Sequence, residues 1–181
     1  DALNEQLGNY LNIHKVHIDN SVPPAVLFNP IPVGFNFEKK QNPLKFADYS
    51  KIKMPTNIND LAFYSIGELA QLIKTKQISS TQLTKFFLER LKKYGPILHS
   101  VITLTEERAL KQAQKADEEI AKGIYRGMLH GIPFGVKDLI AAKGYKTTWG
   151  AAPFKDQVID EDATVIKKLE DAGAVLVAEL T

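Results

Sequence analysis

One segment near residue 170 constrains the fold more than any other, because a helix pattern, a glycine and an uninterrupted apolar run follow one another. Asp162 is placed to cap this helix, and Gly173 is placed to end it. The run 174–178 contains no polar residue, which is typical of a strand that is buried on both faces. This order predicts a layered α/β fold. We expect the inner face of the helix to consist of Val165, Leu169 and Ala172.

Two capping boxes mark the starts of helices earlier in the chain. Ser65 stands three residues before Glu68, and Ser79 stands three residues before Gln82. The dipeptide Gly95-Pro96 is expected to end the second helix, because proline removes a backbone donor. The buried faces that the spacing predicts are Ile66, Leu69, Ala70 and Ile73 in the first helix and Leu83, Phe87, Leu91 and Tyr94 in the second.

A strand and a third helix are expected between these helices and the apolar run. Residues 100–104 have the composition of a short strand, and Thr105 is placed to cap the helix that follows. Gly123 is expected to end this helix, and the glycine-punctuated segment 131–140 predicts a further buried strand. The buried stripe expected for the third helix is Ala109, Ala113, Ala116 and Ile120.

The first 62 residues differ from the rest of the chain. They have little helical periodicity and contain six of the nine prolines, which are Pro23, Pro24, Pro30, Pro32, Pro43 and Pro55. We therefore expect two regions, a Pro/Phe-rich extension over 1–62 and a body over 63–181 on which it packs. The residues expected to anchor the extension are Val26, Leu27, Phe28, Phe35 and Phe37.

Composition excludes several classes of function. The formal net charge is only +2, which provides no general attraction for nucleic acid or an anionic membrane, so we expect no direct nucleic-acid partner. The absence of cysteine excludes disulfides, thiolate nucleophiles and cysteine-based metal sites, and we expect no cofactor or metal. No apolar run approaches the length of a membrane-spanning helix. The sequence is compatible with a cytoplasmic protein and with a periplasmic or secreted one. It is also compatible with a homodimer.

The segment Leu129–Ile140 has the residue pattern that points most clearly to chemistry. Its sequence LHGIPFGVKDLI places Lys137 among apolar residues in an expected interior strand. Burial of an ammonium group favours loss of its proton, and a neutral amine can exchange protons with a hydroxyl as a catalytic histidine does. Alternatively, Lys137 pairs with Asp138 or reaches solvent as an ordinary surface charge. Composition alone does not decide between these interpretations.

This segment is similar to the lysine motif of the amidase-signature family, which typically reads L-x-G-I-P-x-x-V-K-D. The similarity extends from Phe63 to Thr181 and includes the segments 144–150 and 160–175 in the same order. It implies the amidase-signature fold, with helices layered around a mixed β-sheet, of which this chain supplies the N-terminal part. It also implies hydrolysis of amide bonds in small-molecule substrates.

The resemblance further implies a Ser-cisSer-Lys mechanism with an acyl-enzyme intermediate, in which Lys137 is the catalytic lysine. No Gly-Ser-Ser-Gly-Gly-like run occurs in the chain, so we expect both serines downstream of Thr181 and residues 1–181 alone to be inactive. The only adjacent serines, Ser79-Ser80, are better explained as a helix cap far from the glycine motif. Two alternatives remain: the glutaminase subunit of a tRNA-dependent amidotransferase, and a non-catalytic binding module.

Other candidate residues have simpler explanations. His130 is expected to be a turn histidine, and the pair His14 and His17 is expected to be solvated, without a metal. Asp138 either orients the lysine site or bonds nearby backbone. Trp149 and Tyr145 could face a substrate, but core packing is the better expectation for both aromatic side chains.

Overall fold

The structure is a computed structural model that describes all residues except 1, 20, 23–30, 32–33, 38–42 and 44. The chain forms two units, Asp1–Lys45 and Phe46–Thr181. The extension over 1–62 and its packing on the body stay predictions. Among its expected anchors, Val26, Leu27 and Phe28 lie outside the described residues, whereas Phe35 and Phe37 are exposed and contact each other edge to face.

The first unit contains one helix that the sequence analysis did not predict. This helix, α1, spans Ala2–Ile13, and all of its residues but Gly8 are exposed. The spacing of Leu7 and Leu11, one helical turn apart, was the available signal. Its polar neighbours and the proline-rich residues that follow concealed this pattern.

The second unit contains a three-stranded mixed sheet with the strand order β1-β3-β2. The central strand β3 (Val175–Leu180) pairs antiparallel with β1 (Val101–Leu104) and parallel with β2 (Pro133–Lys137). A parallel pair needs a crossover connection, and α5 (Thr164–Asp171) lies in this connection. The other elements are the short 3₁₀ helices η1 (Ile58–Phe63) and η2 (Ala152–Phe154) and the helices α2 (Ile66–Lys74), α3 (Ser80–Leu98) and α4 (Glu106–Ala121).

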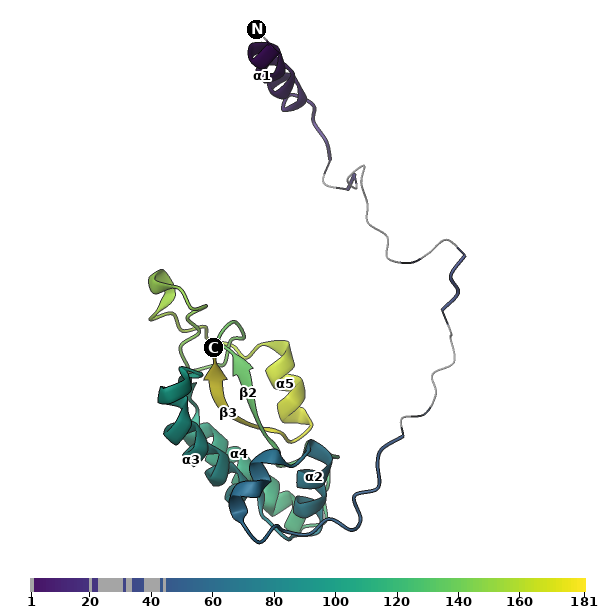
Figure 1. Ribbon diagram of the computed structural model, residues 1–181, viewed down its shortest axis with the longest axis vertical. Coiled ribbons are helices and arrows are strands. Elements are labelled where there is room, and N and C mark those ends of the chain that lie inside the picture. Colours follow the sequence, from purple (N-terminus) through teal and green to yellow (C-terminus); the bar gives the residue numbers. More distant parts are fainter. Residues whose placement is uncertain (1, 20, 23–30, 32–33, 38–42, 44) are drawn as a thin grey trace. The chain divides into compact units, whose positions relative to one another are not determined.

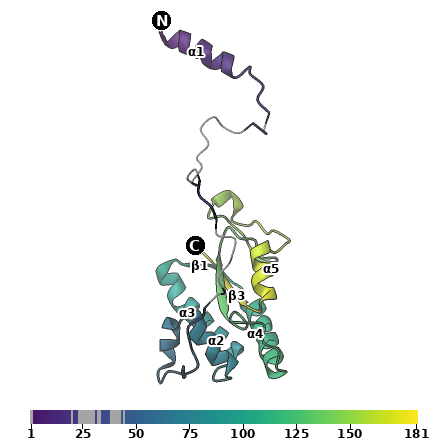
Figure 2. The ribbon, with the colours of Figure 1, turned by 90° about the vertical axis from the view of Figure 1, so that its right-hand side faces the viewer.

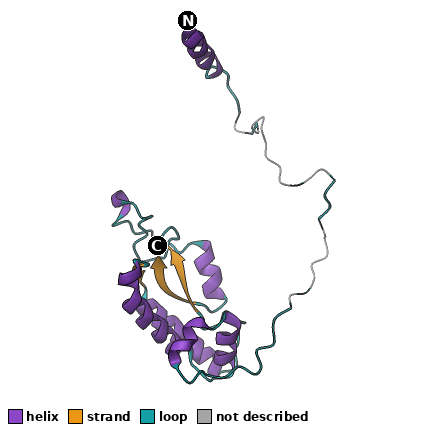
Figure 3. Cartoon of the chain, in the orientation of Figure 1, coloured by secondary structure: helices purple, strands orange, loops and turns teal. Residues whose placement is uncertain are grey.

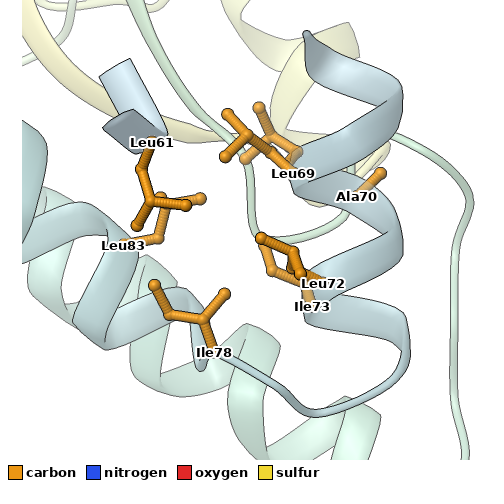
Figure 4. Close-up of a cluster of buried hydrophobic side chains, with 8 residues drawn as sticks. Leu61, Leu69, Ala70, Leu72, Ile73, Ile78 and Leu83 are labelled. Atoms are coloured by element: carbon orange, nitrogen blue, oxygen red, sulfur yellow. The ribbon is translucent and has the colours of Figure 1, made fainter. Parts of the chain in front are cut away.

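The sheet lies between two helical layers (Figure 1), and the view turned by 90° again places it between α3 and α5 (Figure 2). Residues of α3 and α4 form one core with the sheet, and Ile166 of α5 forms another with Val136 and Leu176. Helices make up most of the unit around the strands (Figure 3). A third core joins η1, α2 and α3 (Figure 4), in which Leu61, Leu72 and Leu83 are fully buried. The mixed α/β architecture expected from the sequence is confirmed.

The pairing of β2 with β3 contains one extra residue on β3. Phe134 pairs with Leu176, but Gly135 pairs with Ala178, so Val177 has no partner on β2. Beyond this bulge, Glu179 pairs with Val136. Because paired residues on neighbouring strands share a face, Glu179 lies on the same face as Val136, which belongs to the core beneath α5.

The two predicted capping boxes are confirmed. The Ser65 hydroxyl accepts a hydrogen bond from the Glu68 amide, and the Ser79 hydroxyl accepts one from the Gln82 amide. In return, the Glu68 carboxylate and the Gln82 side chain accept from the amides of Ser65 and Ser79. These bonds connect residues three apart, so local sequence is sufficient to predict them.

Two other residues expected to cap helices make no capping hydrogen bond, because their side chains have distant partners. Thr105 occupies the cap position of α4, but its hydroxyl donates to the carbonyl of Leu176 at 2.7 Å. Asp162 lies two residues before α5, and its carboxylate accepts from the Arg108 guanidinium and from the Lys143 amide at 2.8 Å. Both residues connect elements of the fold, a role that local spacing does not reveal.

The expected end of the second helix is also wrong. Helix α3 continues through Gly95 and Pro96 to Leu98, and His99 ends it with a φ of 51°. Proline clashes with the backbone N–H and the Cβ of a helical preceding residue, and Gly95 has no Cβ. The glycine is also needed for packing, since an added Cβ would lie 2.7 Å from Cγ2 of Val101.

The predicted inner faces are confirmed in part. The buried alanines of α4 and residues Leu69, Ala70, Ile73 and Leu83 lie in the core, as expected. Ile66, Tyr94 and Val165 are instead exposed, and Ile166 is the fully buried residue of α5. In α5 only the first residue of the expected face is wrong, because Leu169 and Ala172 are half-buried as predicted.

Candidate active site around Lys137

Lys137 is the last residue of β2 and pairs with Leu180 of β3. Its side chain is exposed, whereas that of the preceding Val136 is buried. The sequence analysis expected this side chain to be buried, and within the described residues that expectation is wrong. Alternation along the strand accounts for this, because only one face of β2 packs on the core beneath α5. Within the described residues, the Lys137 amine has no ion-pair partner, so the suggested pair with Asp138 is not formed.

A small cavity of about 150 Å³ lies at the end of β2. It collects residues from β1, from the end of β2 and from the loop between β2 and α5, which extends past the ends of β2 and β3 (Figure 1). A larger cavity of about 580 Å³ lies along α3 and does not include Lys137. The lining of the small cavity is Ile102, Lys137, Asp138, Leu139, Trp149, Gly150 and Thr181.

Asp138 fixes this loop to the end of β2. Its carboxylate is buried and accepts hydrogen bonds from the Thr148 amide at 2.7 Å and from the Thr148 hydroxyl. Its carbonyl accepts from the Trp149 amide at 3.0 Å, and its own amide donates to Leu180 at 2.8 Å. Asp138 therefore bonds backbone and, through it, holds the loop beside Lys137.

Trp149 lies in the cavity wall and not in the core. The Trp149 side chain is 45% exposed and packs against Phe154 with ring centroids 4.8 Å apart. Its φ of 56° falls in the left-handed region, which is rare for a bulky residue. The expectation of core packing is thus wrong for Trp149, whereas Tyr145 is half-buried and packs against the core that contains Val136.

Glu179 is a buried carboxyl that the sequence analysis did not identify. Its side chain is fully buried, and neither carboxyl oxygen has a hydrogen-bond partner among the described residues. Burial, together with the nearby charge of Asp138, raises the pKa of Glu179 to about 7. A single acidic residue in the otherwise apolar strand 175–180 was the signal that could have revealed it.

His130 lies in a turn, as expected. His130 is fully buried in the turn before β2, where its Nδ1 accepts from the Arg126 amide at 3.1 Å and its Nε2 lies 3.1 Å from Glu119. Burial lowers the pKa of His130, and the charge of Glu119 opposes this effect. His14 and His17 are exposed, and the described residues contain no cluster of three or more His, Asp or Glu side chains suited to a metal ion.

The adjacent serines have structural partners. Ser79 caps α3, and the buried Ser80 hydroxyl donates to the Gly131 carbonyl at 2.8 Å. The expectation that this pair lies far from the glycine motif is therefore wrong in space, although it is right about the helix cap. Gly131 has a φ of 79°, and a Cβ there would lie 2.9 Å from Ser80, so both features require glycine.

Comparison with known proteins identifies the family of this fold. The sequence profile of the family described as Amidase matches residues 82–181, which is more than half of the chain. The chain belongs to the amidase-signature family. The matched region includes the three strands, the 148–150 loop and Lys137. The fold class expected from the resemblance is confirmed, and amide hydrolysis is the chemistry of the family.

Two kinds of relative resemble the chain to the same degree. The A subunit of glutamyl-tRNA(Gln) amidotransferase from Coxiella burnetii is 43% identical over 115 residues, and the putative amidase AmiD from Mycobacterium tuberculosis is 42% identical over 115 residues. Each match covers 64% of this chain and 24% of the relative. The chain therefore spans about a quarter of the length of these relatives.

Solved structures show the same similarity. The peptide amidase from Stenotrophomonas maltophilia is 34% identical to this chain and superimposes with a TM-score of 0.62. The similarity covers 66% of this chain and 25% of the peptide amidase.

No helix in the described ranges is both long enough and apolar enough to cross a membrane.

Proposed function

We propose that the protein hydrolyses amide bonds and that Lys137 is its general base. The observation that carries this proposal is the position of Lys137, which ends β2 within the lysine motif and lines the small cavity. The side chain is exposed, so its amine is accessible to a hydroxyl group and to a substrate. In this proposal, Asp138 acts as a positioning residue through its bonds to the loop.

The proposed reaction uses two serines from a part of the protein outside residues 1–181. The unprotonated Lys137 amine accepts a proton from the bridging serine, which accepts one from the nucleophilic serine as its oxygen attacks the amide carbonyl carbon. The C–N bond of the tetrahedral intermediate then breaks, and the leaving amine takes the proton. Water hydrolyses the resulting ester and regenerates the serine. We expect further parts of the protein to cover Lys137, because removal from water favours the unprotonated amine.

Residues 1–181 alone are inactive in this proposal, since the chain contains no glycine-flanked serine pair. Its only adjacent serines are engaged in the α3 cap and in the bond to Gly131. Adding the part of the protein that supplies the serine pair should restore hydrolysis. Turnover by residues 1–181 alone would contradict this assignment of roles.

The test is replacement of Lys137 by alanine in the protein at its natural length. We expect kcat/KM for simple primary amides to fall by roughly 10²–10⁴-fold, the usual contribution of a general base. The thermal midpoint should change little, because Lys137 forms no ion pair within the described residues. Lys143→Ala is the matched control, since Lys143 is an exposed lysine that pairs with Asp160 and does not line the cavity. Retained turnover in Lys137→Ala would exclude this function for Lys137.

A second candidate function is that of a glutaminase component in an assembly that amidates tRNA-bound glutamate. It is supported by the 43% identity to the Coxiella burnetii amidotransferase protein. The measurement that separates the two functions is hydrolysis of L-glutamine by the isolated protein and in the presence of candidate partner proteins. Activity that appears only with partners would favour the glutaminase component.

The remaining predictions about partners have direct measurements. We propose that the protein does not bind nucleic acid by itself, because its net charge is small. In a gel-shift assay, tRNA should migrate at the same rate with and without the isolated protein. Sedimentation at two or more protein concentrations distinguishes a monomer from the homodimer that the sequence permits.

A further inference from the structure

The small cavity at the end of β2 combines Lys137 with an apolar wall. Ile102, Leu139 and Trp149 line it, and their side chains are 41%, 56% and 45% exposed. They come from β1, from the residues after β2 and from the loop fixed by Asp138. Two parts of the loop after β2 and the more distant β1 thus place apolar surface beside one amine. An ordinary surface lysine does not require such a surrounding.

Trp149 is held in this wall by several contacts. A left-handed backbone costs a residue with a side chain about 1–2 kcal/mol, so it persists only where the surroundings enforce it. Here the Trp149 amide bonds to the Asp138 carbonyl, the preceding Thr148 bonds to the Asp138 carboxylate, and Phe154 packs against the indole. The indole is therefore presented at a defined place next to Lys137.

The acidic group of the cavity is not available to a cationic ligand. The Asp138 carboxylate is already engaged by Thr148, so it is not free to receive an ammonium group. The volume of about 150 Å³ equals that of an engineered apolar protein cavity that takes up benzene. An aryl or branched alkyl group fits this space and gains from burial, whereas the ammonium group of free glutamine would lose water without gaining a carboxylate partner in the cavity.

We infer that Trp149 is a specificity-determining residue that binds an aryl or branched alkyl group next to the scissile amide. This inference rests on the proposed function, since it assigns the substrate class of the same site. It favours amides with an apolar acyl part over glutamine, and therefore favours a stand-alone amidase over a glutaminase component.

The first experiment compares phenylacetamide with acetamide, which lacks the phenyl group, in the protein at its natural length. We expect the unmodified protein to prefer phenylacetamide in kcat/KM. Trp149→Ala should lose at least roughly tenfold more kcat/KM on phenylacetamide than on acetamide, because an apolar pocket discriminates by its contacts with the added group. Trp149→Phe should retain most of the preference. Phe63→Ala is the matched control, since Phe63 is 84% exposed and lies outside the cavity.

The second experiment separates this inference from the proposed function. Calorimetry with phenylacetamide measures binding in Lys137→Ala, whose apolar wall is intact, and in the double variant that also carries Trp149→Ala. We expect Lys137→Ala to bind phenylacetamide and the double variant to bind it at least roughly tenfold more weakly. Equal affinity in the two variants, or equal losses on both amides in the first experiment, would overturn the role of Trp149. Turnover retained by Lys137→Ala would instead overturn the role of Lys137.

Discussion

Replacing Glu179 by glutamine should make the stability of the protein less dependent on pH. Burial and the charge of Asp138 raise the pKa of the Glu179 carboxyl from 4.5 to about 7. Below pH 4.5 the carboxyl is protonated in both the folded and the unfolded state, so it carries no penalty. Between pH 4.5 and 7 only the unfolded state loses the proton, and stability falls by about 1.4 kcal/mol per pH unit. The loss is complete above pH 7, at roughly 3 kcal/mol in total.

Glutamine has nearly the shape of glutamic acid and does not ionise. Glu179→Gln should therefore match the unmodified protein near pH 4.5 and exceed it by roughly 3 kcal/mol at pH 8. Urea unfolding at several pH values measures this difference. Glu118→Gln, which changes an exposed carboxyl on α4, is the control and should show no such pH-dependent gain. A constant difference between the Glu179 variant and the unmodified protein across this range would refute the reasoning.

Two further substitutions test the packing around the sheet. Gly173→Ala should destabilise the protein by more than about 1 kcal/mol. The φ of 87° disfavours a side chain, and the added Cβ would lie 2.4 Å from Cδ2 of His130. A thermal midpoint equal to that of the unmodified protein would argue against this close contact. Arg108→Leu should cost roughly 3–5 kcal/mol, because it leaves the half-buried carboxylates of Asp162 and Glu170 without their cation. Urea unfolding checks this value. The difference from the unmodified protein should narrow at acid pH, because the Arg108 guanidinium lowers the pKa of Asp162 only while the folded structure holds the pair, and a protonated Asp162 needs no cation.

The sequence predicted those parts of the fold whose causes are local. The capping boxes of α2 and α3 and the small-residue stripe of α4 connect residues within one or two helical turns, so their spacing was sufficient. Thr105 and Asp162 resemble caps equally well, yet their partners are 71 residues away at Leu176 and 54 residues away at Arg108. Spacing along the chain carries no information about such contacts.

The candidate site shows the same limit. The motif identified Lys137 as the residue to examine, but its exposure depends on which face of β2 meets the core beneath α5. The burial of Glu179 depends on the register between β2 and β3, and the position of Trp149 depends on the bonds from Asp138 to the loop. These are properties of the folded sheet, and an apolar run by itself does not determine them.

The bulge at Val177 determines which helical layer the last residues of β3 meet. Without the bulge, strict alternation along β3 would place Leu180 on the side of Leu176, beneath α5, and Glu179 on the side of Val175. Leu180 now packs in the core that α3 and α4 form with the sheet, so the two side chains would exchange sides. The Glu179 carboxyl would then enter that larger apolar core, and the loss of one irregular residue position would act as two core substitutions at once.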